Sequence, residues 1–228
     1  MRKAVLFDLD DTLTDRRASI ARYARRFHVD FLSDLEAIDV AKIETLIYDL
    51  DRGGYTPREN VFLALRRELP WESAPDVSRL ADHWEASFPV ETASREGVVS
   101  TLENLRLRGF VLGVVTNGRD KIQQPKIDSL GIRSLLNSIV ISEIVGFEKP
   151  DARIFKRSLD ELGCAECDAW FVGDHPKNDI LGAAAAGLQS VWLRGVHAWP
   201  VGLPPPQRQI DRLCDVLEIV RGPEGGGD

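Results

Sequence analysis

The sequence is poor in cysteine and has no long hydrophobic run. Three cysteines occur among 228 residues. This odd number does not suggest a disulfide framework, and it favours a reducing compartment. The apolar stretch after Arg2 and Lys3 ends at Asp8, which is too short for the hydrophobic part of a secretory signal. No run approaches the length that crosses a bilayer. We therefore expect a cytoplasmic protein without a membrane partner.

An excess of basic residues is also missing. The chain has 29 Lys and Arg against 36 Asp and Glu, a formal net charge of −7 at pH 7. Because binding to a phosphate backbone requires a basic surface, we expect no nucleic acid partner. Hydrophobic residues make up 43% of the chain, enough to bury a substantial core in one globular domain, alone or with an inserted second unit.

Paired carboxylates follow the first apolar run. Ala4-Val5-Leu6-Phe7 precedes Asp8-Leu9-Asp10-Asp11-Thr12-Leu13. In extended chain, residues i and i+2 point to the same side, so Asp8 and Asp10 are expected to face one crevice. Carboxylates this close resist joint ionisation unless a cation lies between them. The segment alone leaves two interpretations open: a metal-assisted site with one Asp as nucleophile and one as proton carrier, or a solvated Asp-rich turn.

Later segments repeat the arrangement of an apolar run followed by polar residues. Segments with helical periodicity separate these runs, a pattern typical of an α/β fold with a parallel sheet whose strand ends share one edge. We predict a Rossmann-like parallel sheet flanked by helices. The polar clusters are Thr116-Asn117-Gly118 after Phe110 to Val115, Glu148-Lys149-Pro150-Asp151 after Ile139 to Ile141, and Gly173-Asp174 continuing to Asn178-Asp179 after Trp170 to Val172.

The region between Leu13 and about Glu96 has only helical spacing. Its clearest apolar stripe comprises Val77, Leu80, Ala81, Trp84 and Phe88, which repeat at helical intervals. We predict that residues 1–15 and 94–221 form the core domain and that residues 16–93 form an inserted α-helical unit. Residues 222–228, rich in glycine, are expected to be disordered.

The four polar clusters, in this order, resemble the motifs of the haloacid dehalogenase-like (HAD) hydrolases. The matching segments are Asp8 to Thr12, Thr116 to Gly118, Lys149-Pro150 and Gly173-Asp174 with Asn178-Asp179. The resemblance covers roughly residues 1 to 194, and the helical insertion resembles the helical cap of the first cap subclass. Four motifs in order are far more specific than a lone Asp-x-Asp.

The resemblance implies roles for the acidic residues. Asp8 is the expected nucleophile that forms an aspartyl-phosphate. Asp10 is the expected acid that protonates the leaving alcohol and then activates water, with a pKa raised by acidic surroundings. Mg²⁺ is expected on the Asp8 carboxylate, the Asp10 backbone carbonyl and Asp174, with Asp179 reaching the ion through water.

The resemblance also implies phosphate-binding groups. Thr116 and the backbone amides of Asn117 and Gly118 are expected to hold phosphoryl oxygens, with the glycine allowing a close approach of the backbone. Lys149 is expected to neutralise Asp8 and the transferring group. His175 directly follows Asp174, and whether it touches the site stays open. His197 has no evident partner in the sequence.

The sequence therefore predicts a Mg²⁺-dependent phosphomonoester hydrolase acting on a small phosphorylated metabolite. Nucleotides, flavin mononucleotide or its pathway intermediates, and sugar phosphates are the expected substrate classes. A phosphomutase of the same family is an alternative. A receiver-type signalling domain is a second one, disfavoured by Asp10 and by the helical insertion. The natural substrate, pathway and oligomeric state stay open.

Specificity is expected in the helical insertion. The segment Asp51-Arg52-Gly53-Gly54-Tyr55-Thr56 has the composition of a loop, and its two glycines permit unusual backbone dihedrals. We predict Arg16, Tyr55 and Arg58 as substrate-contacting residues. A plain surface turn around Tyr55, and a hinge or solvent role for Arg16, are equally compatible with the sequence.

Overall fold

The chain forms two compact units. The computed structural model describes residues 2–33 and 39–220; the predicted tail, residues 222–228, lies outside them. The sheet unit comprises Met1–Thr14 and Ser94–Asp228, and the helical unit comprises Asp15–Ala93. The chain passes from one unit to the other through two short strands, β2 (Thr14–Asp15) and β3 (Ala93–Ser94), which pair with each other.

The sheet unit contains a six-stranded sheet in the order β5-β4-β1-β6-β7-β8. All of its pairings are parallel. The chain builds outward from β1 on one side and then returns to add β6 on the other, so β1 lies between β4 and β6. Ligands of such sheets bind beyond the carboxyl ends of the strands, where the strand order reverses. The strands are β1 (Lys3–Phe7), β4 (Phe110–Thr116), β5 (Ser138–Ile141), β6 (Ala169–Gly173), β7 (Gln189–Leu193) and β8 (Gln209–Ile210).

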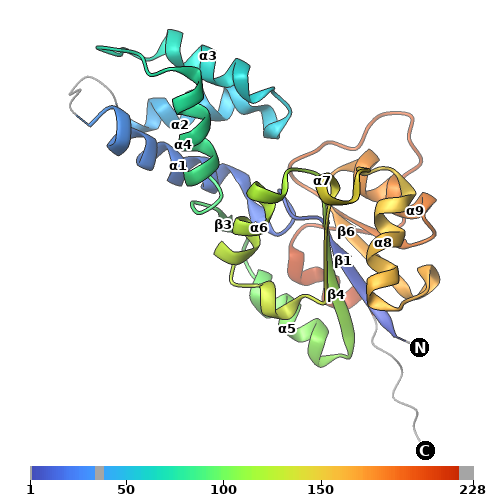
Figure 1. Ribbon diagram of the computed structural model, residues 1–228. Coiled ribbons are helices and arrows are strands. Elements are labelled where there is room, and N and C mark those ends of the chain that lie inside the picture. The colour runs from blue at the N-terminus through green and yellow to red at the C-terminus, as the bar shows by residue number, and fades with distance from the viewer. Residues whose placement is uncertain (1, 34–38, 221–228) are drawn as a thin grey trace, which may run out of the picture. The chain divides into compact units, whose positions relative to one another are not determined.

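Helices cover both faces of this sheet (Figure 1). Val5 and Phe7 of β1 pack in one apolar cluster with residues of α5 and α10, whereas Ala4 and Leu6 pack in another with residues of α8 and α9. This alternation explains why β1 is apolar at successive positions, since a strand covered on both faces has no solvent side. The helices are α5 (Val98–Leu107), α6 (Asp120–Ser129), α7 (Ser142–Val145), α8 (Ala152–Leu162), α9 (Gly182–Ala185) and α10 (Val216–Ile219).

The helical unit has its own aromatic core. Leu80, Trp84 and Phe88 of the predicted stripe are buried and pack with Tyr23 and Phe27. The rings of Trp84 and Phe88 stack with their centroids 4.0 Å apart. The described helices of this unit are α1 (Arg16–Phe31), α2 (Val40–Asp51), η1 (Arg52–Gly54, a short 3₁₀ turn), α3 (Arg58–Glu68) and α4 (Val77–Ser87).

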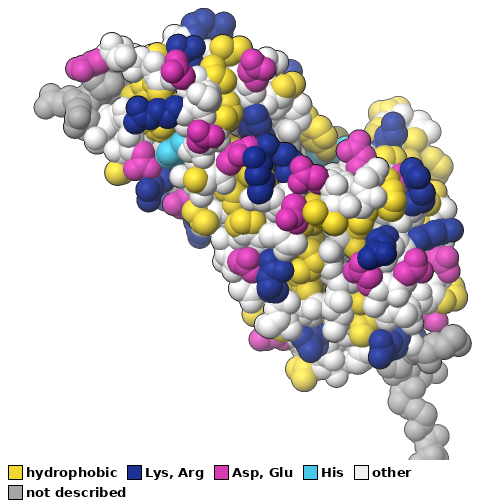
Figure 2. All heavy atoms as spheres, in the orientation of Figure 1, with side chains coloured by type: hydrophobic (Ala, Val, Ile, Leu, Met, Phe, Trp, Pro, Cys, Tyr) yellow, Lys and Arg dark blue, Asp and Glu magenta, His cyan; other side chains and the backbone are white. Residues whose placement is uncertain are grey.

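The surface carries charges of both signs. On the face shown in Figure 2, basic and acidic side chains are interspersed. Several form local ion pairs, such as Arg157 with Glu161 on α8 at 2.9 Å. Within residues 2–33 and 39–220, no helix combines the length and apolar character needed to cross a bilayer.

Candidate active site

The predicted polar residues meet at the carboxyl ends of three neighbouring strands. Asp8 directly follows β1, and its N–H donates to the Val172 carbonyl of β6 at 2.9 Å. Thr116 is the last residue of β4, and Asp174 directly follows β6. Because β1 pairs with both β4 and β6, these three side chains start from adjacent strand ends.

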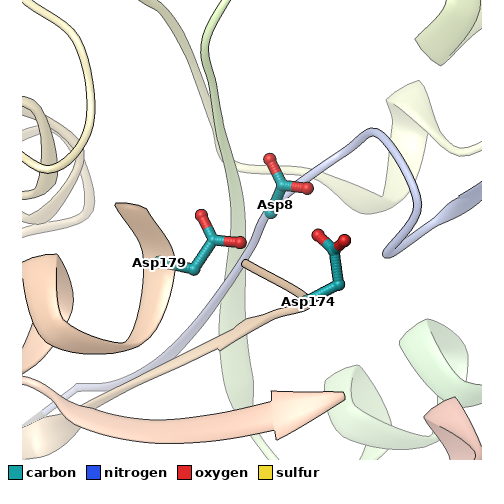
Figure 3. Close-up of side chains that lie close together, drawn as sticks. All are labelled: Asp8, Asp174 and Asp179. Carbon is teal, nitrogen blue, oxygen red and sulfur yellow. The ribbon is translucent and has the colours of Figure 1, made fainter. Parts of the chain in front are cut away.

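Asp8, Asp174 and Asp179 form a cluster of buried carboxylates. One oxygen from each lies within 4.8 Å of the others, and their exposed fractions are 7%, 3% and 1%. Figure 3 shows the three side chains converging, Asp179 from the helical turn that follows Asp174. This turn is the π-helical segment η4 (Pro176–Leu181). Gly173 makes the approach possible, since a Cβ there would lie 2.5 Å from the Asp179 side chain.

Lys149 brings one ammonium into this acidic cluster. Its Nζ lies 2.5 Å from Oδ1 of Asp8 and 2.7 Å from Oδ1 of Asp179. The side chain of Asn117 fixes the backbone of Lys149 from both sides: Nδ2 donates to the Lys149 carbonyl at 3.0 Å, and Oδ1 accepts from its N–H at 2.8 Å. Lys149 thus contacts two of the three carboxylates of the cluster, and its one positive charge leaves two negative charges uncompensated when all three are ionised.

Burial and mutual repulsion perturb the acids of the cluster. Burial raises the pKa of Asp174 to about 9, and the nearby charges of Asp8 and Asp179 act in the same direction. Burial also raises the pKa of Asp8 to about 7, although Lys149 opposes the shift. For Lys149, burial lowers the pKa, but the carboxylates of Asp179 and Asp8 outweigh burial and raise it above its ordinary value. The cluster therefore requires a further positive charge, or protons, to be stable.

The donor set fits a hard divalent cation. All three converging groups supply oxygen, the ligand type that Mg²⁺ prefers, and three protein ligands leave coordination positions for water and substrate. The uncompensated negative charge provides the driving force for binding. The chemistry of these residues is therefore compatible with the predicted Mg²⁺.

Asp10 lies beside a buried cation that sequence analysis missed. Nζ of Lys126 contacts both carboxylate oxygens of Asp10, at 2.7 and 2.9 Å. Nε2 of Gln123 donates to Oδ2 of Asp10 at 2.9 Å and to Oγ1 of Thr116 at 2.6 Å. The acidic surroundings expected for Asp10 are thus only part of its environment. The sequence carried no distinct signal for this contact, because polar residues on a helix are typically exposed.

Residues 5–193 match the family described as haloacid dehalogenase-like hydrolase. The chain belongs to this family. A glyceraldehyde 3-phosphate phosphatase from Methanopyrus kandleri is 32% identical over 97% of this chain and 98% of its own length. A phosphoglycolate phosphatase from Agrobacterium fabrum is 29% identical over 92% and 87%. The predicted enzyme class, a phosphatase, is confirmed by these relatives.

Solved structures of HAD proteins share the fold. YfnB from Bacillus subtilis, solved bound to magnesium, is 25% identical and superimposes with a TM-score of 0.72 over 96% of this chain and 98% of its own. A HAD phosphatase from Thermococcus onnurineus, 24% identical, gives a TM-score of 0.67 over 96% and 98%. The predicted α/β fold with a Rossmann-like parallel sheet is confirmed.

One predicted phosphate-binding amide of the HAD site is engaged elsewhere. The N–H of Gly118 donates to Oγ of Ser142 at 2.9 Å, and its expected role as a phosphate ligand stays a prediction. Gly118 also makes room for Gln123: its φ is +147°, and a Cβ there would lie 3.1 Å from Cγ and Cδ of Gln123. The side chain of Asn117 hydrogen-bonds the backbone of Lys149. The backbone amide of Asn117 stays a predicted phosphate ligand.

Two histidines lie next to Asp174. The N–H of His175 donates to Oδ2 of Asp179 at 2.9 Å, and its Nδ1 accepts from the N–H of Asn178 at 3.0 Å, so this residue caps the start of η4. His197 follows β7; its Nε2 lies 3.5 Å from Oδ2 of Asp174 and its ring lies 4.7 Å from that of His175. The expectation that His197 has no partner is wrong, because a loop beyond β7 returns to the site.

The three residues predicted to set specificity belong to the helical unit. Arg16 is 8% exposed and donates twice to the buried carboxylate of Asp51, at 2.7 and 2.8 Å. Arg58 contacts the same carboxylate at 2.5 Å and stacks over Trp84 at 4.5 Å. Tyr55 is 60% exposed. The two arginines thus share the Asp51 carboxylate within their own unit, and direct roles of Arg16, Tyr55 and Arg58 with substrate stay predictions.

Proposed function

We propose that this HAD phosphatase hydrolyses a small phosphomonoester through an aspartyl-phosphate on Asp8, with Mg²⁺ as cofactor. The observation that carries the proposal is the pairing of the buried Asp8 carboxylate with the Lys149 ammonium at 2.5 Å inside a three-carboxylate cluster. A buried, oriented carboxylate at a strand end is suited to nucleophilic attack, and the surrounding charges are suited to phosphoryl transfer, which depends mainly on positioning and electrostatics.

The proposed reaction has two chemical steps. Asp8 attacks phosphorus, the bond to the alcohol oxygen breaks, and the carboxyl group of Asp10 delivers a proton to that oxygen. Asp10 then takes a proton from water, the water oxygen attacks phosphorus, and the bond to Asp8 breaks. The products are the alcohol, inorganic phosphate and a regenerated Asp8. Thr116 and Lys149 hold the phosphoryl oxygens in both steps.

The cofactor has a defined set of candidate ligands. Asp8, Asp174 and the backbone carbonyl of Asp10 would hold Mg²⁺, and Asp179 would contribute directly or through water. When bound, Mg²⁺ supplies positive charge that neutralises the phosphoryl oxygens. Lys149 contacts both Asp8 and Asp179, at 2.5 and 2.7 Å, and holds these two carboxylates at the site.

We further propose that the helical unit acts as a substrate-selecting cap. It is inserted directly after the first motif, and it carries the exposed Tyr55 next to Arg52 and Gly53, which have positive φ angles of 47° and 68°. A cap excludes water during the reaction and admits substrate when it opens.

Short phosphorylated carbon chains are the proposed substrate class. The support is the glyceraldehyde 3-phosphate phosphatase that is similar along almost the whole chain. The test is release of inorganic phosphate from a panel of glyceraldehyde 3-phosphate, phosphoglycolate, pyrimidine nucleotides and flavin mononucleotide, each with Mg²⁺ and with chelator. We expect Mg²⁺-dependent release, fastest with the shortest substrates. Absence of release from every ester would refute the proposed reaction, and a preference for nucleotides would refute the substrate class alone.

The mechanism has a direct chemical test. Rapid acid quenching with a radiolabelled substrate is expected to trap label on the protein in an acyl phosphate that hydroxylamine removes. Asp8→Asn is expected to trap none.

The working compartment is proposed to be a reducing cytoplasm, supported by the three free thiols of Cys164, Cys167 and Cys214.

A further inference from the structure

Two side chains of α6 hold the carboxylate of Asp10. Lys126 contacts both of its oxygens, and Gln123 donates to Oδ2. The carboxylate is therefore contacted by an ammonium on both oxygens and by an amide on one. A side chain held through several charge-assisted hydrogen bonds has little rotational freedom.

Gln123 and Lys126 are built into the interior of the sheet unit. Their exposed fractions are 1% and 3%. The same face of α6 carries Ile127, which belongs to the apolar core. Burying an amide and an ammonium costs free energy unless both are hydrogen-bonded. Surface positions would avoid that cost, and the hydrogen bonds to Asp10 offset it for both buried side chains.

Gln123 also links Asp10 to the phosphate-binding strand end. One amide nitrogen donates to Oδ2 of Asp10 at 2.9 Å and to Oγ1 of Thr116 at 2.6 Å. Gly118 leaves space for this amide, because a Cβ at that position would lie 3.1 Å from the Gln123 side chain. The distance between the proton carrier and the predicted phosphate ligand is thereby set through a single side chain.

We propose that Lys126 and Gln123 are positioning residues that orient the carboxyl group of Asp10 toward the leaving-group oxygen. The inference rests on the proposed function and adds to it two residues outside the four family motifs. Proton transfer requires heavy atoms within about 2.6–3.2 Å, and a displacement of about 1 Å costs roughly 10²-fold in rate. Both residues act through Asp10, because their described contacts in the site are with its carboxyl oxygens and, for Gln123, with Thr116 and the Asn117 carbonyl.

The test compares two esters of matched shape, phenyl phosphate and 4-nitrophenyl phosphate. The nitrophenolate departs with little help from an acid, whereas phenolate requires a proton. Lys126→Met is expected to lower kcat on phenyl phosphate by about 10- to 100-fold and on 4-nitrophenyl phosphate by less than about 3-fold. Lys126→Arg is expected to retain most of the rate on both. The matched control is Lys156→Met on the exposed face of α8, which is expected to change neither rate.

A double variant separates positioning from general damage. Because Lys126 acts through Asp10, Asp10→Asn/Lys126→Met is expected to be no slower than Asp10→Asn alone. If Lys126→Met does not fold, Gln123→Met tests the same contact. It is expected to lower kcat more on phenyl phosphate than on 4-nitrophenyl phosphate. Equal losses on the two esters, or additive losses in the double variant, would overturn the positioning role while the proposed function stands. Absence of phosphate release by the wild-type enzyme from these two esters and from every member of the metabolite panel would overturn the proposed function and this inference with it.

Discussion

The ammonium of Lys149 lies 2.5 Å from Oδ1 of Asp8, and both side chains are almost completely buried. The two residues lie 141 positions apart in the chain. Their contact fixes the orientation of the proposed nucleophile before substrate arrives. It also compensates only one of the three carboxylates in the cluster, which leaves a site that attracts a cation.

Asp8→Asn tests the nucleophile directly. The variant keeps the shape of the side chain but removes the attacking oxygen anion, so we expect kcat to fall by at least about 10³-fold. The melting temperature of the metal-free protein is expected to stay equal or rise, because burial makes the Asp8 charge unfavourable. Steady-state phosphate release and calorimetric melting measure the two quantities. Asp160→Asn, an exposed position on α8, is the control, and residual activity above about 1% in the folded variant would contradict covalent catalysis.

The elevated pKa values of the cluster predict how stability depends on pH. Burial, with the charges of Asp8 and Asp179, raises the pKa of Asp174 from 3.8 to about 9. Between these values the folded metal-free protein binds a proton that the unfolded chain has released, so the free energy of unfolding falls as pH rises. We expect the wild-type melting temperature in chelator to drop between about pH 5 and pH 9, and Asp174→Asn to drop less.

Mg²⁺ affinity is expected to follow the opposite trend. Because the ion competes with protons for the same carboxylates, its affinity rises with pH over this window. Titration calorimetry and the Mg²⁺-induced rise in melting temperature both measure the Mg²⁺ affinity independently of activity. Asp174→Asn is expected to abolish most of that rise, and Asp160→Asn to preserve it. A melting temperature difference between wild type and Asp174→Asn that is constant with pH would show that Asp174 is ionised without metal.

The sequence predicted the sheet and its acidic edge because both depend on local patterns. The run Ala4 to Phe7 is apolar at every position, which indicates a strand covered on both faces, and Asp8 follows it directly. The role of Lys126 was not predictable in this way. A lysine at a helical position is typically a surface residue, and only the long-range contact with Asp10, 116 positions away, shows that this one is buried. His197 was missed for the same reason.

The buried ion pairs of the helical unit lead to a prediction on stability. Asp51 is fully buried and contacts Arg16 and Arg58, and its pKa is lowered because their hydrogen bonds and charges outweigh burial. Asp51→Ala leaves two guanidinium groups without their shared partner and is expected to cost about 3–5 kcal/mol in the free energy of unfolding. Urea denaturation measures this change. Asp49→Ala, exposed on the same helix, is expected to change it by less than about 0.5 kcal/mol, and equal effects of the two variants would refute a stabilising role for the ion pairs.

Tyr55 offers the sharpest test of the cap proposal. Its side chain is 60% exposed and contributes little to the core of the helical unit, so Tyr55→Ala is expected to leave the melting temperature nearly unchanged. If this loop contacts substrate, the variant changes the ratio of kcat/KM values among glyceraldehyde 3-phosphate, phosphoglycolate and nucleotides. The value for 4-nitrophenyl phosphate changes little, because a small aryl ester lacks remote groups through which the cap can contribute binding energy.

The matched control for this loop is Tyr48→Ala on α2, where the ring is 42% exposed and lies against the Arg17 guanidinium at 5.1 Å. It removes the same aromatic surface from the same unit outside the loop, and we expect it to leave the kcat/KM ratios unchanged. Selectivity that shifts with Tyr55→Ala and not with Tyr48→Ala places the specificity surface in the loop. A uniform loss over all substrates, or equal shifts in both variants, would place it elsewhere, since only a residue that contacts the variable part of the substrate discriminates among esters with a common phosphate.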